Sequence, residues 1–404
     1  MSDHNSATPD GVAARPGKAG AVDISLPAFA ATFVAGGGRD VDTARIPTPT
    51  ALEPGARVRL LDPAGEEIGL AVADPDNARL RVLAVPADKL AAIDGALLAL
   101  RVERALAWRT QLGLVGDDRA YRLVHGAGDG LPGFACDVLG RVAVVYAYGA
   151  GLFTLGKQLA EAIVGFARLD GAVVKLRARG GADAVEQELI GNVPEKILAY
   201  EHGVGYEIHP LGGLNVGLFT DMREHRLGLA RFARGARVLN LFSYTGALGL
   251  ACARAGAAAV TNVDTSEGVQ AWAQGNFTRA GVTGRFETGD AVRFLARAQR
   301  DRERYELVIV DPPTFSTARG APWVLDRDYP ALIAQAAEVV TEGGMLWLAA
   351  NTHELGSLAK LVQKGVRTAG RVATIVEQGG LPPEYPTVAA QPHDRYLQIC
   401  VVRL

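Results

Sequence analysis

Acidic side chains follow three apolar runs in the C-terminal half of the chain. Asp264 follows AAVTNV (258–263), Asp290 comes shortly after RFET (285–288), and Asp311 ends ELVIVD (306–311). If these runs are parallel strands, their carboxylates meet at the carboxyl edge of one sheet, where such sheets bind ligands. A carboxylate after the second strand can accept both hydroxyls of a ribose, and one after the third can accept an adenine amino group. This order predicts a nucleoside site.

The turn after the first apolar run indicates a nucleoside without phosphates. RVLNLF (237–242) leads into Ser-Tyr-Thr-Gly (243–246), which has hydroxyl groups and a closing glycine but does not match GxGxxG. The pyrophosphate cradle of a dinucleotide site is therefore missing. An adenosine that lacks phosphates points to S-adenosylmethionine. We expect this cofactor to contact Asn240, Phe242, Ser243, Tyr244, Thr245, Gly246, Asp264, Ser266, Asp290 and Asp311.

Each of these residues also has a purely structural interpretation. Asp264 and Asp290 precede helical stretches and could be helix N-caps. Asp-Pro-Pro (311–313) could be an ordinary turn, although a carboxylate with two rigid prolines after a buried strand is an unusual choice for one. Phe315 could belong to the core. The ordered combination favours the cofactor site over these separate explanations.

The elements that must position these residues alternate between strands and helices. Apolar runs at 237–242, 258–263, 306–311 and 343–350 are separated by helical stretches, which predicts a parallel sheet covered on both faces. RVATIVEQ (371–378) and RYLQICVVRL (395–404) have a proline-rich loop between them, so they predict a final antiparallel hairpin. We therefore expect an α/β fold, a Rossmann-like, seven-stranded class I methyltransferase domain over 205–404.

The N-terminal half has a different pattern. Alternating segments broken by turns predict a small β domain over 23–105, including a connecting helix that continues from 87 to 113. Strand-like runs at 142–148 and 172–178 flank a helix at 152–167, which predicts a compact central α/β domain over 106–204. Residues 1–22 are polar and lack an apolar signal region, so we expect a disordered tail and a cytoplasmic protein.

Composition excludes several classes of protein. Among 404 residues, hydrophobic ones make up 49% and charged ones 21%, which indicates a folded globular protein. No uncharged apolar run reaches the length of a transmembrane helix. The three cysteines lie far apart and the seven histidines are scattered, so we expect no disulfide framework and no metal site. The net charge of −2 neither indicates nor excludes a nucleic-acid partner.

Four stretches resemble the bacterial 23S rRNA methyltransferases of the RlmI and RlmK kind. They are YRLVHGAGDGLPGFACDVLGR (121–141), GLFTDMREHR (217–226), RVLNLFSYTGALGLACARAGAAAVTNVDTS (237–266) and ELVIVDPPTFS (306–316). The resemblance implies that Arg223 and Arg226 also contact S-adenosylmethionine, and that Met222 replaces the glutamine usual in this family. It further implies that the β domain is PUA-like, with RNA binding or a scaffold role as the two alternatives.

The resemblance leaves the methylated atom to be decided. The RlmI branch makes 5-methylcytosine with a thiol in a Ser-Cys-Ser stretch, where this chain has Ala-Ala-Asn (349–351). Carbon 5 needs such a nucleophile, and Cys136, Cys252 and Cys400 lie elsewhere in the sequence. The RlmK branch methylates guanine N7, which needs only positioning. We therefore expect methylation of a base nitrogen, with cytosine C5 methylation, a non-catalytic RNA-binding protein and a small-molecule methyltransferase as alternatives.

The resemblance to RNA methyltransferases also suggests roles around the base. Asp311 and the Pro312 carbonyl could accept hydrogen bonds from it, Phe315 could stack on it, and Asn351 could bind its edge or cap a helix. For the RNA backbone we expect contacts from Lys175, Arg177, Arg179, Arg319 and Arg327, unless these are ordinary solvated side chains. The expected partner is RNA, with no membrane, no metal and a homodimer as one option.

Overall fold

The computed structural model describes residues 21–47, 52–90, 92–116, 119–177, 186–313, 324–353 and 356–404. They form two compact units. Unit 1 contains the chain up to Val115, Arg122–Val193 and the short segment Pro386–Pro392, and unit 2 contains Gly116–Tyr121, Pro194–Tyr385 and His393–Leu404. No helix among the described residues is long and apolar enough to cross a membrane.

The first sheet of unit 1 has five strands in the order β1-β3-β4-β5-β2. They are β1 (Val22–Ser25), β2 (Asp40–Asp42), β3 (Arg57–Leu61), β4 (Glu67–Asp74) and β5 (Arg79–Ala84). Helix α1 (Ala28–Ala35) packs Ala30, Ala31 and Val34 into the core of this sheet. The sequence did not predict α1, because its AFAATFVA run is apolar on nearly every side and has no helical period.

Helix α2 (Gly95–Gln111) connects the two sheets of unit 1 and is shorter than predicted. It begins at Gly95 rather than Ala87, because the Asp94 carboxylate accepts the backbone N–H groups of Ala96 (3.0 Å) and Leu97 (3.1 Å) and so caps the first turn. Its Arg109 is fully buried and forms a bidentate ion pair with Asp129 at 2.5 and 2.8 Å. This pair gives the GAGDG part of the 121–141 stretch a structural role.

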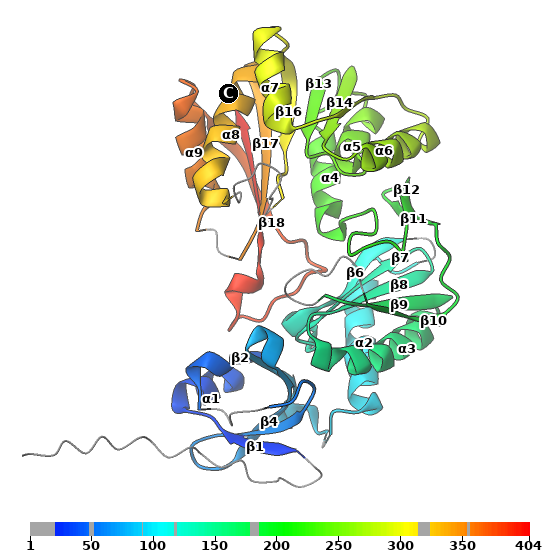
Figure 1. Cartoon of the computed structure of the whole chain (residues 1–404), viewed down its shortest axis with the longest axis vertical. Helices are drawn as coiled ribbons and strands as arrows, with labels where there is room; N and C mark the ends of the chain where they lie inside the picture. Colours follow the sequence, from blue (N-terminus) through cyan, green and yellow to red (C-terminus); the bar gives the residue numbers. More distant parts are fainter. Residues whose placement is uncertain are drawn as a thin grey trace, which may run out of the picture. The chain divides into compact units, whose positions relative to one another are not determined.

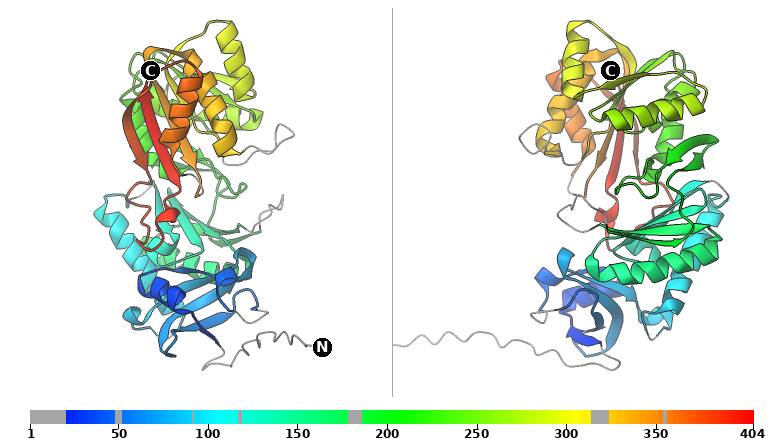
Figure 2. Two further views of the ribbon diagram at one scale, coloured as in Figure 1. Left: turned by 90° about the vertical axis from the view of Figure 1, so that its left-hand side faces the viewer. Right: turned by 45° about the vertical axis from the view of Figure 1, so that its right-hand side comes forward.

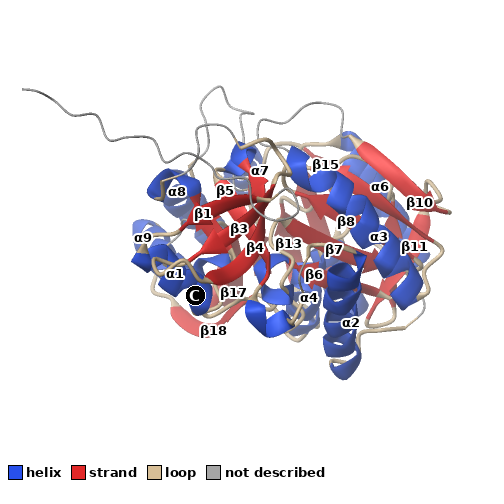
Figure 3. Ribbon diagram, turned by 90° about the horizontal axis from the view of Figure 1, so that it is seen from below, coloured by secondary structure: helices blue, strands red, loops and turns tan. Residues whose placement is uncertain are grey.

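The second sheet of unit 1 has the order β10-β9-β8-β7-β6. Its strands are β6 (Ala120–His125), β7 (Phe134–Leu139), β8 (Val142–Ala147), β9 (Gly171–Leu176) and β10 (Gln187–Gly191). Helix α3 (Phe153–Ala167) joins the parallel pair β8 and β9 and lies along this sheet (Figure 3). Its buried Leu155, Leu159 and Ile163 recur at helical spacing, which explains why the sequence predicted it.

Unit 2 is built on a seven-stranded sheet with the order β15-β14-β13-β16-β17-β19-β18 (Figures 1 and 2). The strands are β13 (Arg237–Leu241), β14 (Ala259–Asp264), β15 (Arg285–Thr288), β16 (Tyr305–Val310), β17 (Val340–Asn351), β18 (Thr374–Gly380) and β19 (Leu397–Arg403). Strands β13 to β17 pair in parallel, whereas β19 is antiparallel to both of its neighbours. The carboxyl ends of the parallel strands therefore lie at one edge.

Helices cover both faces of this sheet. On one face are α4 (Arg223–Ala230), α5 (Ala247–Arg254) and α6 (Glu267–Arg279), and on the other are α7 (Ala291–Arg300), α8 (Leu325–Val339) and α9 (Leu358–Thr368) (Figure 1). The side chains of α7, α8 and α9 form one buried cluster with apolar residues of the strands. A small hairpin of β11 (Ile197–Glu201) and β12 (Val204–Ile208) also belongs to unit 2.

Candidate active site at the carboxyl edge of the sheet

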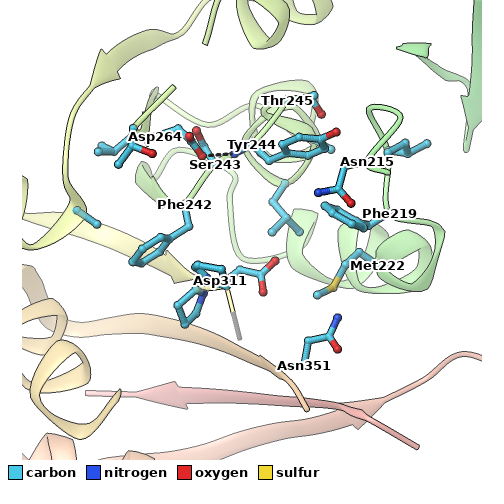
Figure 4. Close-up of a pocket in the computed structure, with 18 of the residues that line it drawn as sticks. Asn215, Phe219, Met222, Phe242, Ser243, Tyr244, Thr245, Asp264, Asp311 and Asn351 are labelled. Atoms are coloured by element: carbon cyan, nitrogen blue, oxygen red, sulfur yellow. Dashed lines mark hydrogen bonds between the residues drawn. The ribbon is translucent and has the colours of Figure 1, made fainter. Parts of the chain in front are cut away.

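A cavity of about 330 Å³ lies at the carboxyl edge of the seven-stranded sheet (Figure 4). Nine of the residues predicted from the sequence line it: Arg226, Phe242, Ser243, Tyr244, Thr245, Asp264, Asp311, Pro312 and Asn351. Eight of them lie at or just after the carboxyl ends of β13, β14, β16 and β17, and Arg226 lies on α4. The parallel topology brings them together, because each strand delivers its carboxyl end to the same edge.

The turn after β13 forms one wall of the cavity and has an unusual backbone. Phe242, Tyr244 and Gly246 all have positive φ, at 57°, 47° and 77°. The Ser243 N–H donates to the Val263 carbonyl at 3.0 Å, which fastens the turn to β14. Non-glycine residues in this region are strained and persist only where surrounding structure holds them. The turn is therefore fixed in shape before any ligand binds.

Asp264 fastens the same turn and also faces the cavity. Its carboxylate accepts the Tyr244 N–H at 2.9 Å and the Ser266 N–H at 3.1 Å. The N-cap of α6 is Ser266, whose hydroxyl accepts the Val269 N–H at 3.3 Å, so Asp264 is not the helix cap considered in the sequence analysis. Asp264 lines the cavity, whereas Ser266 does not.

Three other predicted cofactor residues support the site without lining the cavity. Asp290 caps α7 by accepting the Arg293 N–H at 3.0 Å, while its neighbours Gly289 and Ala291 line the cavity. Asn240 is buried and donates to Asn262 on the adjacent strand at 2.9 Å. A Cβ at Gly246 would lie 3.0 Å from that of Ala273, so this glycine permits close packing of α5 and α6.

The two arginines of the GLFTDMREHR stretch occupy different places. Arg226 lines the cavity, is buried, and forms a bidentate ion pair with Glu201 at 2.7 and 2.7 Å. Arg223 does not line the cavity and donates to Glu384 at 2.9 Å. Both guanidinium groups are thus tied to protein carboxylates. Met222, where the resembling family has glutamine, lines the cavity with an apolar side chain.

Asp311 stands at the end of β16, largely withdrawn from water. This desolvation raises the pKa of Asp311 to about 7, the nearby negative charge of Asp221 raises it further, and Arg226 opposes the shift. Below Asp311, the Tyr329 hydroxyl lies 3.0 Å from the Val310 carbonyl and 2.7 Å from the Ala349 carbonyl. Tyr329 therefore holds the ends of β16 and β17 together, and with them the residues that follow.

Part of the cavity wall was not predicted from the sequence. Asn215, Leu218, Phe219, Asp221 and Met222 line it from the segment before α4, and Thr265, Gly289 and Pro313 extend the predicted walls. The Asp221 carboxylate is buried and accepts the Tyr396 hydroxyl at 3.0 Å. Leu218, Phe219, Asp221 and Met222 belong to the GLFTDMREHR stretch (217–226), of which only Met222, Arg223 and Arg226 were considered from the sequence.

The predicted RNA-binding residues differ in whether they are buried, exposed or outside the described residues. Lys175 lies on β9 with a fully buried side chain, so it does not present its ammonium group on the surface as we predicted. Arg177 and Arg327 are exposed, and Arg327 pairs with Asp328 at 2.7 Å. Phe315, Arg179 and Arg319 lie outside the described residues.

The residues present fit S-adenosylmethionine. Of the described lining residues, Asp221, Asp264 and Asp311 are acidic, and Glu201 neutralises Arg226, the one basic side chain. Such a lining suits a ligand that carries ribose hydroxyls and a positive sulfonium group and lacks phosphates. No group of three or more His, Cys, Asp or Glu that could hold a metal ion occurs in the described parts of the chain.

Comparisons with known proteins agree with this assignment. "Ribosomal RNA large subunit methyltransferase I" of Shewanella denitrificans is 30% identical over 331 residues, 78% of this chain and 82% of that protein. The protein of the same name from Klebsiella pneumoniae is 26% identical over 85% of this chain and 88% of its own length. A structure described as a SAM-dependent methyltransferase from Streptococcus mutans has the same fold, with a TM-score of 0.83 and 23% identity over 95% of this chain and all of that one.

The profile of one family covers more than half of the sequence. It matches residues 150–397 and is that of the S-adenosylmethionine-dependent methyltransferases. All the residues that line the cavity lie within this range, including Asp221, Asp264 and Asp311. The chain therefore belongs to the S-adenosylmethionine-dependent methyltransferase family, and S-adenosylmethionine is its cofactor.

Proposed function

We propose that this protein methylates a base of large-subunit ribosomal RNA. The observation that carries the proposal is the similarity over 78% of the chain to a relative named for that substrate. The similarity extends well beyond the segments that line the cavity, as expected if the whole chain serves the same kind of substrate. A fold shared with solved methyltransferases would not by itself distinguish RNA from other substrates.

Some residues of the cavity would bind the cofactor, and others would bind the base. S-adenosylmethionine supplies an electrophilic methyl group when bound. Asp264 would hold the ribose hydroxyls, with the turn at 242–245 beside it. Asp311, the Pro312 carbonyl and Asn351 would accept or donate hydrogen bonds to the base and hold it in line with the methyl group. Arg223, Asn240, Gly246, Ser266 and Asp290 would support the cofactor site indirectly, because they do not line the cavity.

The position of the cysteines favours a base nitrogen as the methylated atom. Methylation at cytosine C5 requires a thiolate beside the base. Cys136, Cys252 and Cys400 are all buried, and none is among the described residues that line the cavity. Burial raises the pKa of all three thiols, that of Cys400 to about 11. The C5 alternative predicts a covalent adduct with RNA that contains 5-fluorocytosine, and the base-nitrogen proposal predicts none.

The remaining parts of the proposal concern the whole protein. We infer a PUA-like β domain over 23–105 and a central α/β domain over 106–204, which would present RNA to the methyltransferase domain at 205–404. The β domain is supported by the five-stranded sheet β1-β3-β4-β5-β2. Arg177, Arg179, Arg319 and Arg327 would contact phosphates. We further propose a cytoplasmic location, and a homodimer remains one option for the assembly.

Transfer of tritium from methyl-labelled S-adenosylmethionine tests the substrate. We expect the purified full-length protein to label an unmodified transcript of large-subunit ribosomal RNA, and digestion to nucleosides to place the label on one base. The protein without RNA is the control, because a small-molecule methyltransferase would not depend on the transcript. Absence of labelling in the transcript and in the particles assembled from it would contradict the proposal.

A further inference from the structure

The cavity has a second wall on the side opposite Asp264 (Figure 4). In Figure 4, Asn215, Phe219 and Met222 lie on the far side of the cavity from Asp264. Phe219 lines the cavity although 44% of its surface is exposed. Part of this aromatic side chain is therefore accessible to a ligand in the cavity.

Phe219 ends a row of four aromatic rings. His209 stacks on Trp272 with centroids 3.8 Å apart and an interplanar angle of 11°. Trp272 is 6.3 Å from Tyr244, and Tyr244 is 5.2 Å from Phe219 at an angle of 45°. The row thus runs from the end of β12 past α6 to the cavity, and each ring limits the movement of the next.

The backbone behind Phe219 is held firmly in place. Its carbonyl accepts the Arg226 guanidinium at 2.9 Å, and Arg226 is itself clamped by Glu201. On the next residue, the Thr220 hydroxyl lies 2.5 Å from the Tyr385 hydroxyl. The Trp272 indole donates to the Glu207 carbonyl at 3.0 Å. These contacts position the Phe219 ring before a ligand arrives, so little entropy is lost when a flat group stacks on it.

The groups beside this ring suit a nucleobase rather than an aliphatic ligand. Asn215 and Asp221 line the same wall and offer an amide and a carboxylate next to the aromatic face. A flipped-out base is bound by stacking on aromatic side chains and by hydrogen bonds to its edge. We propose that Phe219 is the stacking platform for the target base, and hence a substrate-positioning residue. This inference rests on the proposed action on RNA.

Four variants of the full-length protein test this role. The measurement is tritium transfer from S-adenosylmethionine to the large-subunit ribosomal RNA transcript, analysed as kcat and KM for RNA. Removing one base–aromatic contact lowers affinity about 5- to 150-fold. We expect Phe219→Ala to lower kcat/KM within this range, Phe219→Leu to restore little, and Phe219→Tyr to restore most of it. Phe166→Ala is the matched control, because Phe166 is also 44% exposed but lies on α3 of unit 1 and does not line the cavity.

Calorimetric titration with S-adenosylmethionine separates this role from cofactor binding. We expect Phe219→Ala to bind the cofactor as the wild type does, because Phe219 lies across the cavity from Asp264. A lost cofactor affinity, equal kcat/KM for Phe219→Ala and wild type, or full rescue by leucine would each overturn the stacking role. If the wild type binds the cofactor but methylates no RNA, the proposed function itself fails, and the stacking role fails with it.

Discussion

Three carboxylates share the cavity, and their neighbours give them different properties. Asp264 accepts hydrogen bonds from two backbone N–H groups. Asp221 accepts a tyrosine hydroxyl. Asp311 stands at a strand end, and loss of water raises its pKa to about 7. The charge of Asp311 therefore changes near neutral pH.

Asp264→Ala should abolish cofactor binding at micromolar concentrations. The substitution removes the acceptor for the ribose and releases the turn at Tyr244, and hydrogen bonds to a charged group contribute about 1.5–3 kcal/mol each. Calorimetric titration with S-adenosylmethionine measures the effect. Asp301→Ala is the control, since Asp301 is a carboxylate on the surface that pairs with Arg300 at the end of α7. Unchanged affinity of Asp264→Ala would remove Asp264 from the cofactor site.

The affinity for S-adenosylmethionine should rise with pH through about 7. Below the pKa of Asp311 the carboxyl is neutral, and above it the carboxylate attracts a positive ligand in the same cavity. Asp311→Asn should weaken this increase, and titrations of wild type and variant over a pH series measure the difference. Asp221→Asn should shift the midpoint to lower pH, because the negative charge of Asp221 raises the pKa of Asp311.

The raised pKa of Asp311 also makes the free energy of unfolding depend on pH. The pKa of Asp311 is higher in the folded protein than the ordinary value near 4, so the folded state binds the proton more tightly. Asp311 therefore contributes most to the free energy of unfolding at acid pH, and this contribution falls as the pH rises from about 4 to about 7. Identical pH profiles of urea unfolding for wild type and Asp311→Asn would contradict the raised pKa.

At the scale of elements, the site depends on the strained turn between β13 and α5. Its geometry is maintained by β14, through Val263 and Asp264, and by α6, against which Gly246 packs. The strain is concentrated where the cofactor must approach the backbone, as is common in binding sites. Neighbouring elements thus preserve a conformation that the turn would not keep alone.

Gly246→Ala should destabilise the protein by about 1–2 kcal/mol, because alanine disfavours a left-handed backbone. Its φ is 77°, and the added Cβ would also press on Ala273 at 3.0 Å. Gly275→Ala is the matched control within α6. It meets no atom within 4 Å and should stabilise the helix by about 0.5–1 kcal/mol. Urea denaturation measures both, and equal effects of the two substitutions would contradict the role of the turn.

At the scale of the whole molecule, the chain does not divide at one point into two units. The segment Pro386–Pro392 lies between β18 and β19 in sequence yet belongs to unit 1. There, Gln391 accepts the Arg39 N–H at 2.5 Å and donates to Asp40 at 2.9 Å. Any truncation that keeps only one unit therefore cuts through packed contacts.

Gly128→Ala should loosen this segment. An added Cβ would lie 1.8 Å from the Pro386 carbonyl oxygen and 2.4 Å from its carbon, so the backbone must move. Such overpacking costs about 1–3 kcal/mol. We expect faster proteolysis within 386–392, detected by mass spectrometry of the fragments. Gly165→Ala on α3 has no neighbour within 4 Å and should leave the rate unchanged. Equal rates for Gly128→Ala and wild type would contradict the packing of this segment.

The sequence by itself determined the regular elements of unit 2 and the edge at which they deliver polar residues. The alternation of apolar runs and helical stretches is a local property, and β13, β14, β16 and β17 lie within a few residues of the predicted runs. Because parallel strands end at one edge, Asp264, Asp311 and Asn351 could be placed together without coordinates. Helix α1 was not predicted and the start of α2 was placed too early, because short apolar runs and helix caps give weak local signals.

Only the tertiary structure decided which side chains meet. Arg226 pairs with Glu201 across 25 residues, and Asp221 meets Tyr396 across 175 residues. Phe219 reaches the ring of Tyr244, and Lys175 is buried rather than exposed. These contacts depend on how segments far apart in the sequence pack together, which neither the spacing of residues nor the amino-acid composition predicts. The polar residues at the strand ends can therefore be identified from local sequence, whereas the second wall of the cavity forms only when the chain folds.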